Sequence, residues 1–290
     1  MTIEKITQDH FDDALRCLQN MSLSKETIVF RGQQDTKWRL HTTWARFKSF
    51  EQESRSSDMV GLLDQFKTNL AKLGQMPFEE NNHLDWLEYA QHHGVPTPYL
   101  DFTYSPYVAL FFSFNGLEDI KEAESEEEYV VVYALNINQL AHHWAKASGE
   151  FDERVYQSFL SPSTHLFDEG FPGNTLQFIR QPGKSNARMQ RQQGAFLYDT
   201  LDYHSLGFDD LEEYMDHIQE SKPLDYNGTQ APPTLTKVFI NKKCIREVFQ
   251  ILELMNITGT MLFLDSSGAA MDVRNTYYYK PKTMMLRGFD

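Results

Sequence analysis

The sequence has little cysteine, little basic charge and no long apolar run, and each shortage excludes a class of protein. Cys17 and Cys244 are the only cysteines in 290 residues, which is typical of a reduced compartment, and their spacing fits neither a metal centre nor a redox motif. Lysine and arginine total 27 against 41 acidic residues, and the net charge of −14 repels polyanions. The composition therefore argues against a disulfide framework and against general binding to nucleic acid or to anionic membranes.

No apolar stretch approaches the roughly 20 residues that span a bilayer, so we expect no membrane partner. The first residues lack the basic segment and apolar core of a signal peptide, and we expect a cytoplasmic protein. What the chain has in abundance is aromatic residues, with 21 phenylalanines and 14 tyrosines. Such a composition predicts a folded chain with an aromatic-rich core.

Apolar periodicity predicts helices and strands that are interspersed along the chain. Helices are expected in the N-terminal segment 1–22, beginning near Asp9, and over 59–73, 84–90 and 245–255. Strands are expected over 27–30, 129–134, 195–198, 235–240 and 261–264. The acidic residues 118–128 are expected to form a solvated surface connection, and residues 138–183 show no clear pattern. We therefore expect an α+β fold, a single compact domain over 1–290 with a mixed, mainly antiparallel sheet flanked by helices.

Residues 91–106 are the most informative stretch, because they place a glutamine, two histidines, an aspartate, two threonines and a serine between apolar segments. Polar loops held between rigid elements often carry functional sites. Asp101, Thr103 and Ser105 alternate, so an extended chain would point all three to one face, whereas a turn would make Asp101 a helix cap. Ser105 before Pro106 is a helix start signal. The apolar run behind it predicts a buried helix or, alternatively, a buried strand.

The histidine pair within this stretch does not indicate a metal site. Neighbouring side chains diverge on a helix or a strand, so His92 and His93 cannot chelate one ion together. No spacing typical of metal ligands occurs in the sequence, and no metal is expected. One histidine is expected to hydrogen-bond a ligand or a carbonyl, and the other to cap a helix or lie on the surface. The Walker A, GxGxxG and GxSxG motifs are also absent from the sequence.

Two arginines are candidates for binding an anion. Arg31 closes a short apolar run, where a strand is expected to end, and its guanidinium suits phosphate or carboxylate. Gly32 beside it would let a ligand approach the backbone. A structural ion pair with an acidic residue is the alternative for Arg31. Arg188 and Gln192 precede the strand-like residues 195–198, and that segment fits either ligand recognition or a solvated turn.

These fragments together resemble the FRG family, named for the Phe/Tyr-Arg-Gly at its start. Residues 30–38 resemble this start and the tryptophan that follows it, and residues 86–106 resemble the block Trp-Leu-x-x-Ala-Gln-His-x-Gly-x-Pro-Thr-Arg-Leu-Leu-Asp-Trp-Thr-x-x-Pro. Residues 188–196 are similar to Arg-x-x-x-Gln-x-Gly-x-Phe, and residues 262–268 to Leu-Phe-Pro-Asp-x-Asp-Gly. Pro98 replaces the arginine of the long block, which leaves Arg31 and Arg188 as the cations of interest.

The resemblance implies a cytoplasmic bacterial or phage-associated protein, with a suspected role as a toxin or in phage defence. The Arg-Gly pair is also similar to the NAD-binding arginine of ADP-ribosyltransferases, which implies NAD as the cofactor and a protein or a nucleic acid as the target. The residues implied to bind the nucleotide are Arg31, Gly32, Gln33, Gln91, Thr97, Thr103 and Arg188. Those implied to be catalytic are Arg31, His92, Asp101 and Gln192.

Two other functions stay open. A hydrolase or nuclease would use Asp101, Asp265 and His92 for acid–base or metal-assisted chemistry. A non-catalytic sensor would bind a nucleotide or a phage protein through the same cleft. The catalytic hypotheses require the candidate residues to converge on one pocket, namely Arg31, Gln91, His92, Asp101 and Gln192.

Overall fold

The computed structural model describes residues 4–48, 56–78, 83–117, 128–147, 149–160, 174–180, 187–221, 225–226, 229–230 and 233–279. The acidic connection expected over 118–128 therefore lies outside the described residues, apart from Glu128. None of the helices in these ranges is both long and apolar enough to cross a membrane.

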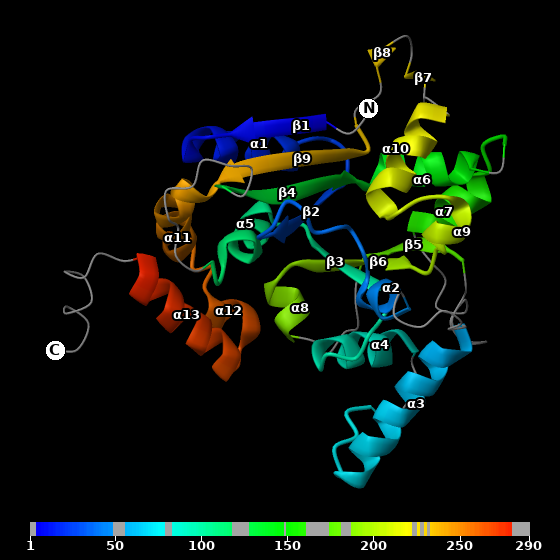
Figure 1. Ribbon diagram of the computed structural model, residues 1–290, viewed down its shortest axis with the longest axis horizontal. Helices are drawn as coiled ribbons and strands as arrows, with labels where there is room; N and C mark the ends of the chain where they lie inside the picture. Colours follow the sequence, from blue (N-terminus) through cyan, green and yellow to red (C-terminus); the bar gives the residue numbers. More distant parts are fainter. Residues whose placement is uncertain are drawn as a thin grey trace.

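Seven strands of the described chain form one sheet, in the order β1-β9-β4-β2-β3-β6-β5 (Figure 1). The strands are β1 Glu4–Gln8, β2 Ile28–Gln33, β3 Tyr99–Thr103, β4 Tyr129–Asn136, β5 Leu176–Ile179, β6 Gly194–Asp199 and β9 Leu235–Asn241. Only β1 and β9 pair in parallel, and the other neighbours are antiparallel. A separate ribbon pairs β7 Asp225–Tyr226 with β8 Thr229–Gln230. The expected α+β class with a mixed, mainly antiparallel sheet is confirmed.

Helices cover both faces of the sheet (Figure 1). On one face, a core with residues from six strands packs under α6 Ile137–Lys146, α7 Glu153–Leu160, α9 Tyr203–Leu206 and α10 Leu211–Ser221. The opposite face carries two helix groups. The first covers β4, β9 and part of β2, and consists of α1 Phe11–Ser22, α5 Pro106–Phe114, α11 Ile245–Leu254 and α12 Gly259–Phe263. The second covers β3 and β6, and consists of α2 Thr43–Lys48, α3 Ser56–Lys72 and α4 His83–His92.

The remaining helices are short or peripheral: α8 Ala187–Arg191, the 3₁₀ turn η3 Lys242–Cys244, and α13 Ser266–Tyr279. Most of the predicted elements are present within a few residues of their expected bounds. The strand β1 was not predicted, and the unassigned region 138–183 contains α7, β5 and most of α6. The core is rich in aromatic residues, as the composition predicted, and its largest fully buried side chains are mostly phenylalanine and tyrosine.

The strand predicted over 261–264 is wrong, because these residues belong mainly to the helix α12. Thr258 caps this helix by accepting a hydrogen bond from the Met261 amide, and Leu264 ends it with a left-handed φ of 58°. Gly259 packs against Gly268 of α13 so closely that an added Cβ would lie 2.5 Å from the Gly268 carbonyl oxygen. This tertiary contact favours the helix, and the short apolar run alone did not reveal it.

The polar stretch 91–106 is not one loop. Gln91 and His92 end α4, residues 99–103 form β3, and Ser105 is the N-cap of α5, accepting from the Val108 amide at 3.3 Å. The extended alternative therefore holds for Asp101, and the helical alternative holds for the apolar run after Ser105. Gln91, His92, Asp101 and Thr103 are thus fixed to regular elements, whereas His93 and Thr97 lie in the connection between α4 and β3.

The sheet opens between β2 and β3. Six register pairs join β2 to β4, from Ile28 to Gln33, and five join β3 to β6. Phe30 and Thr103 are the only register pair between β2 and β3 in the described chain. Arg31, expected where the strand ends, instead lies within β2, because its backbone still pairs with Tyr133 of β4. Strand β2 stays paired with β4, and β3 stays paired with β6, while β2 and β3 separate from each other.

Candidate functional site

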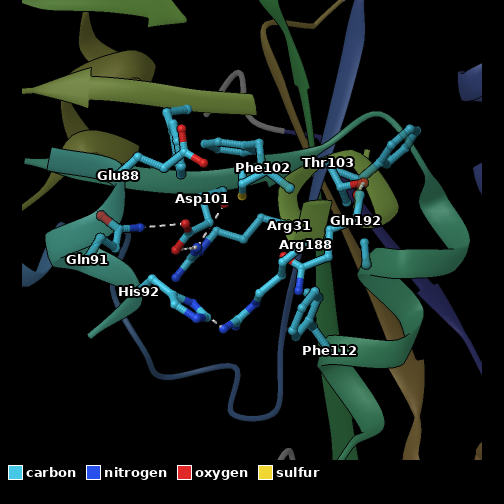
Figure 2. Close-up of a pocket in the computed structure, with 15 residues that line it drawn as sticks. Arg31, Glu88, Gln91, His92, Asp101, Phe102, Thr103, Phe112, Arg188 and Gln192 are labelled. Atoms are coloured by element: carbon cyan, nitrogen blue, oxygen red, sulfur yellow. Dashed lines mark hydrogen bonds and ion pairs between the residues drawn. The ribbon is translucent and has the colours of Figure 1, made fainter. Parts of the chain in front are cut away.

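A pocket of about 320 Å³ lies at this opening of the sheet (Figure 2). Its walls come from β2, β3, α4, α5 and the segment 188–196. Most residues expected at the site line it, namely Arg31, Gly32, Gln91, His92, Asp101, Thr103, Arg188 and Gln192. The volume is at the lower end of the range for small-molecule sites. The expected convergence of Arg31, Gln91, His92, Asp101 and Gln192 is therefore present.

Arg31 bridges the opening of the sheet. Strand alternation places it on the same face as Val29, yet its Nη1 donates to the backbone oxygen of Asp101 at 2.8 Å and lies 3.8 Å from the Asp101 Oδ2. Burial is the main cause that lowers the pKa of Arg31, and the charge of Asp101 opposes it. Its Nε makes no hydrogen bond within the described chain. The structural ion pair considered for Arg31 is thus present, and it lies inside the pocket.

Asp101 is the carboxylate that faces the pocket. Its Oδ1 accepts from Gln91 Nε2 at 2.5 Å, and the Gln91 Oε1 accepts in turn from the Thr97 hydroxyl. The side chain is 58 % exposed toward the pocket, and the surrounding pocket walls still desolvate its carboxylate in part. Burial raises the pKa of Asp101, and Arg31, Gln91 and Arg188 oppose the rise. A carboxyl group with a raised pKa in a pocket is suited to acid–base chemistry.

His92 and Arg188 form a second polar contact, at the lower edge of the view in Figure 2. The Arg188 Nη1 lies 2.5 Å from the His92 Nδ1. Because a guanidinium only donates, this Nδ1 must accept, so the imidazole is neutral with its proton on Nε2. Burial, followed by the charges of Arg188 and His93, lowers the pKa of His92. The ring therefore offers an N–H donor. Both histidines are exposed, but His93 packs on the Tyr89 ring and is not among the residues that line the pocket.

Thr103 and Gln192 connect the elements that form one wall of the pocket. The Thr103 hydroxyl donates to the backbone oxygen of Gln192 at 2.7 Å and accepts from the Ser105 amide at 3.0 Å. The Gln192 Nε2 donates to the carbonyl oxygen of Leu262 at 3.3 Å. These bonds join β3, the start of α5, the end of α8 and α12. Both residues therefore position the walls in addition to lining the pocket.

Three candidate residues lie outside the pocket lining. Thr97 is fully buried and orients Gln91, so its contact with a ligand is indirect. Gln33 is buried at the end of β2, where it pairs with Val131. The Asp265 carboxylate accepts from the Gly268 amide in the first turn of α13, and this bond lowers its pKa. The strand prediction for 261–264 had hidden the capping role of Asp265.

Gly32 lines the pocket, but its lack of a side chain is explained by helix packing. A Cβ added there would lie 1.9 Å from the Ala109 carbonyl oxygen and 2.8 Å from the Ser113 amide nitrogen, both in α5. The absence of the side chain thus lets α5 approach the sheet. The glycine was expected to let a ligand approach the backbone, and the group that approaches it here is α5.

Glu88 is the pocket residue that the sequence analysis missed. It is 4 % exposed, lies on α4 and lines the pocket beside Asp101 (Figure 2). Glu88, Gln91 and His92 stand at positions i, i+3 and i+4 of one helix, so they share a face. This spacing was readable in the sequence, and treating 91–106 as a separate loop concealed it. Aromatic walls also contribute, from Phe102, Phe112 and Phe196.

The donor set fits an anionic organic ligand. Two guanidinium groups and two amide side chains lie beside carboxylates that can accept from hydroxyl groups. Within the described ranges, no group of three or more histidine, cysteine, aspartate or glutamate side chains is arranged to hold a metal ion.

Residues 26–122 match the sequence model of the FRG domain. The matched range contains Arg31, Gln91, His92 and Asp101, whereas Arg188 lies beyond it. No curated protein and no solved structure matches the chain.

Proposed function

Since residues 26–122 match the FRG domain and contribute Arg31, Gln91 and Asp101, we propose that the central pocket binds a nucleotide and that the protein is an enzyme acting on it. The observation that carries the proposal is the meeting of Arg31, Gln91, Asp101 and Arg188 in one pocket, although 157 positions separate the first from the last. Independent helices and strands hold them, which is the arrangement that pre-organised sites require.

The finer proposal is that the nucleotide is NAD, and that the enzyme transfers its ADP-ribosyl group or cleaves it, as a toxin or in phage defence. Arg31 suits a phosphate, because its buried guanidinium has a nitrogen with no hydrogen-bond partner in the described chain. The neutral His92 ring and the Gln91 amide suit ribose hydroxyls and a carboxamide. Phe102 and Phe112 provide apolar walls for a planar ring.

In this reaction the bond between the ribose and nicotinamide breaks, and positive charge develops on the sugar. Asp101 would stabilise that charge, as carboxylates do for oxocarbenium-like states in glycoside hydrolysis. Gln91 donates to the carboxylate, whereas Arg31 donates to the backbone oxygen of Asp101 and lies 3.8 Å from its Oδ2. With its raised pKa, Asp101 is also suited to take the proton of an incoming hydroxyl group.

Calorimetric titration with NAD, combined with mass analysis of released nicotinamide, tests the proposal. We expect the wild type to bind NAD and to turn it over. Asp101→Asn retains the oxygen that accepts from Gln91, so binding should change only a few-fold while turnover falls by about 10²–10⁴. Arg154→Gln, at an exposed position on α7, is the control and should behave as the wild type. A wild type that neither binds nor cleaves NAD contradicts the finer proposal.

A hydrolase or nuclease remains the second candidate, because Asp101 and His92 line the same pocket. Release of nucleotides from RNA or DNA that is lost in Asp101→Asn and in His92→Gln would favour it. Binding of a nucleotide without any turnover would favour a non-catalytic sensor.

A further inference from the structure

A second pocket, of about 420 Å³, adjoins the first. Three residues line both pockets, namely Glu88, His92 and Arg188. We call the two spaces the sheet compartment, at the opening between β2 and β3, and the helix compartment, lined by residues 77 and 78, by α4, by the start of α8 and by the end of α12. The shared residues make the two compartments neighbours, on either side of the contact between His92 and Arg188.

Arg188 stands at the junction of the two compartments. Its Nη1 donates to the His92 Nδ1 at 2.5 Å, and its guanidinium carbon lies 4.2 Å from the centre of the Phe263 ring. Figure 2 shows Arg188 and His92 joined across the edge of the sheet compartment. Burial is the main cause that lowers the pKa of Arg188, with Asp101 and Asp265 opposing it. A cation placed between two hollows is suited to an anionic group that connects their contents.

The lining of the helix compartment favours a planar ring and disfavours an anion. Phe78, Tyr89 and Phe263 give it aromatic walls, and Leu264 lies 48 % exposed at its edge. Asp85 and Glu88 add carboxylates, which repel a phosphate but accept hydrogen bonds from hydroxyl and amino groups. A ring with a polar edge therefore fits this compartment, and the anion belongs at Arg188.

We infer that the two compartments together bind a dinucleotide, with one ring-bearing half in each and the bridging diphosphate at Arg188. This inference rests on the proposed function, and it extends that function by naming a second subsite and the class of ligand that needs it. Leu264, Phe78 and Phe263 then determine whether the enzyme prefers a dinucleotide to a mononucleotide. The contacts proposed above for the half in the sheet compartment, from Arg31, Gln91 and His92, are unchanged.

Calorimetric titration with NAD and with nicotinamide mononucleotide tests the inference, because the mononucleotide has only one half. In the wild type, we expect NAD to bind at least tenfold more tightly than the mononucleotide. Leu264→Trp would fill the helix compartment from its exposed edge, so NAD affinity should fall at least tenfold while mononucleotide affinity stays within twofold. Leu254→Trp, at an 84 % exposed position on α11, is the matched control and should change neither affinity.

The outcomes separate this inference from the proposed function. If the wild type binds both ligands equally and Leu264→Trp changes neither affinity, the inference is wrong and the proposed function stands. If the wild type binds neither ligand, both are wrong. Should Leu264→Trp fail to fold by circular dichroism, the comparison of the two ligands on the wild type still decides, since equal affinities contradict a second subsite.

Discussion

At the residue scale, the two pocket arginines differ in what they hold. Arg31 donates to a backbone carbonyl of β3 and so supports the opening of the sheet. Arg188 donates to a side chain, His92, and so sets the protonation of a candidate catalytic group. Substitution of Arg31 is therefore expected to lower both the stability of the fold and the affinity for a ligand. Substitution of Arg188 is expected to change mainly the protonation of the His92 imidazole.

The His92–Arg188 contact predicts a measurable change in pKa. Arg188→Gln removes a positive neighbour, so protonation of His92 becomes easier and its pKa should rise toward the ordinary value of 6.5. A titration of the His92 imidazole by NMR measures this. Arg191→Gln, on the same helix and exposed, should leave the pKa of His92 unchanged. An unaltered pKa in Arg188→Gln would show that the contact does not form.

The lowered pKa of His92, caused first by burial and then by the charge of Arg188, also predicts a stability trend. The folded-state pKa of His92 is lowered, so the unfolded chain takes up its proton at higher pH than the folded one. The stability that His92 contributes is therefore present above about pH 6.5 and is lost as the pH falls through the folded-state pKa.

Gly32→Ala is predicted to destabilise the fold. The new Cβ would lie 1.9 Å from the Ala109 carbonyl oxygen, and backbone of a buried helix cannot move away at low cost. We expect a loss of about 1–3 kcal/mol or more in the free energy of unfolding, measured by urea denaturation. Gly61→Ala is the control, because nothing lies within 4 Å of its Cβ and it stands inside α3. It should gain about 0.5–1 kcal/mol. Equal effects at both positions would contradict the packing argument.

At the scale of elements, the pocket depends on how strands end and helices begin. β3 passes into α5 through Ser105, and β6 ends at Asp199, whose backbone amide donates to the Pro98 oxygen at 2.8 Å. The Asp199 carboxylate is 4 % exposed and accepts from the Tyr203 hydroxyl and the Leu201 amide. Burial raises the pKa of Asp199 to about 7 and outweighs both hydrogen bonds. The end of β6 therefore carries a titrating carboxyl group that is not part of the pocket lining.

Asp199 predicts that stability declines as the pH rises. Its folded-state pKa is about 7 against 3.8 when exposed, so the folded protein holds a proton that the unfolded chain releases. The contribution is complete below about pH 4 and is lost between pH 4 and 7, by an amount on the order of 2–4 kcal/mol. Urea unfolding of the wild type and of Asp199→Asn across this range measures it. The wild type should lose stability relative to Asp199→Asn as the pH rises, and parallel curves would contradict the assignment.

At the scale of the whole molecule, the fold combines a split sheet with a continuous apolar cluster on one face. One register pair joins β2 to β3, so backbone pairing alone would leave two half-sheets. On one face, however, a single apolar cluster contains Val29, Leu100, Val131 and Phe178, from strands on both sides of the split. The cluster holds the halves together while the opposite face stays open for the pocket.

The expected single domain can be tested at this scale. Because the shared cluster crosses the split, we expect one cooperative unfolding transition in scanning calorimetry, with equal calorimetric and van't Hoff enthalpies. Pro98→Arg introduces the arginine of the FRG block between α4 and β3. This variant should keep the single transition. Two resolved transitions in the wild type would contradict the single domain.

The sequence by itself determined the class of fold, most of the elements and many of the polar residues that line the pocket. Periodicity located α3 and α11, the Ser105–Pro106 pair located the start of α5, and the family resemblance identified Arg31, Gln91, His92 and Asp101. These features depend on local propensity or on motifs, which a single chain segment displays. Glu88 was equally local, and only the misplaced helix end concealed it.

The tertiary structure alone decided the opening between β2 and β3, the helical state of residues 259–263, and the partners of each polar group. Register between distant strands, the contact of Gly259 with Gly268, and the placing of Arg188 against His92 all join segments far apart in the chain. The free energies of such contacts depend on both partners at once, so no single stretch of sequence contains them.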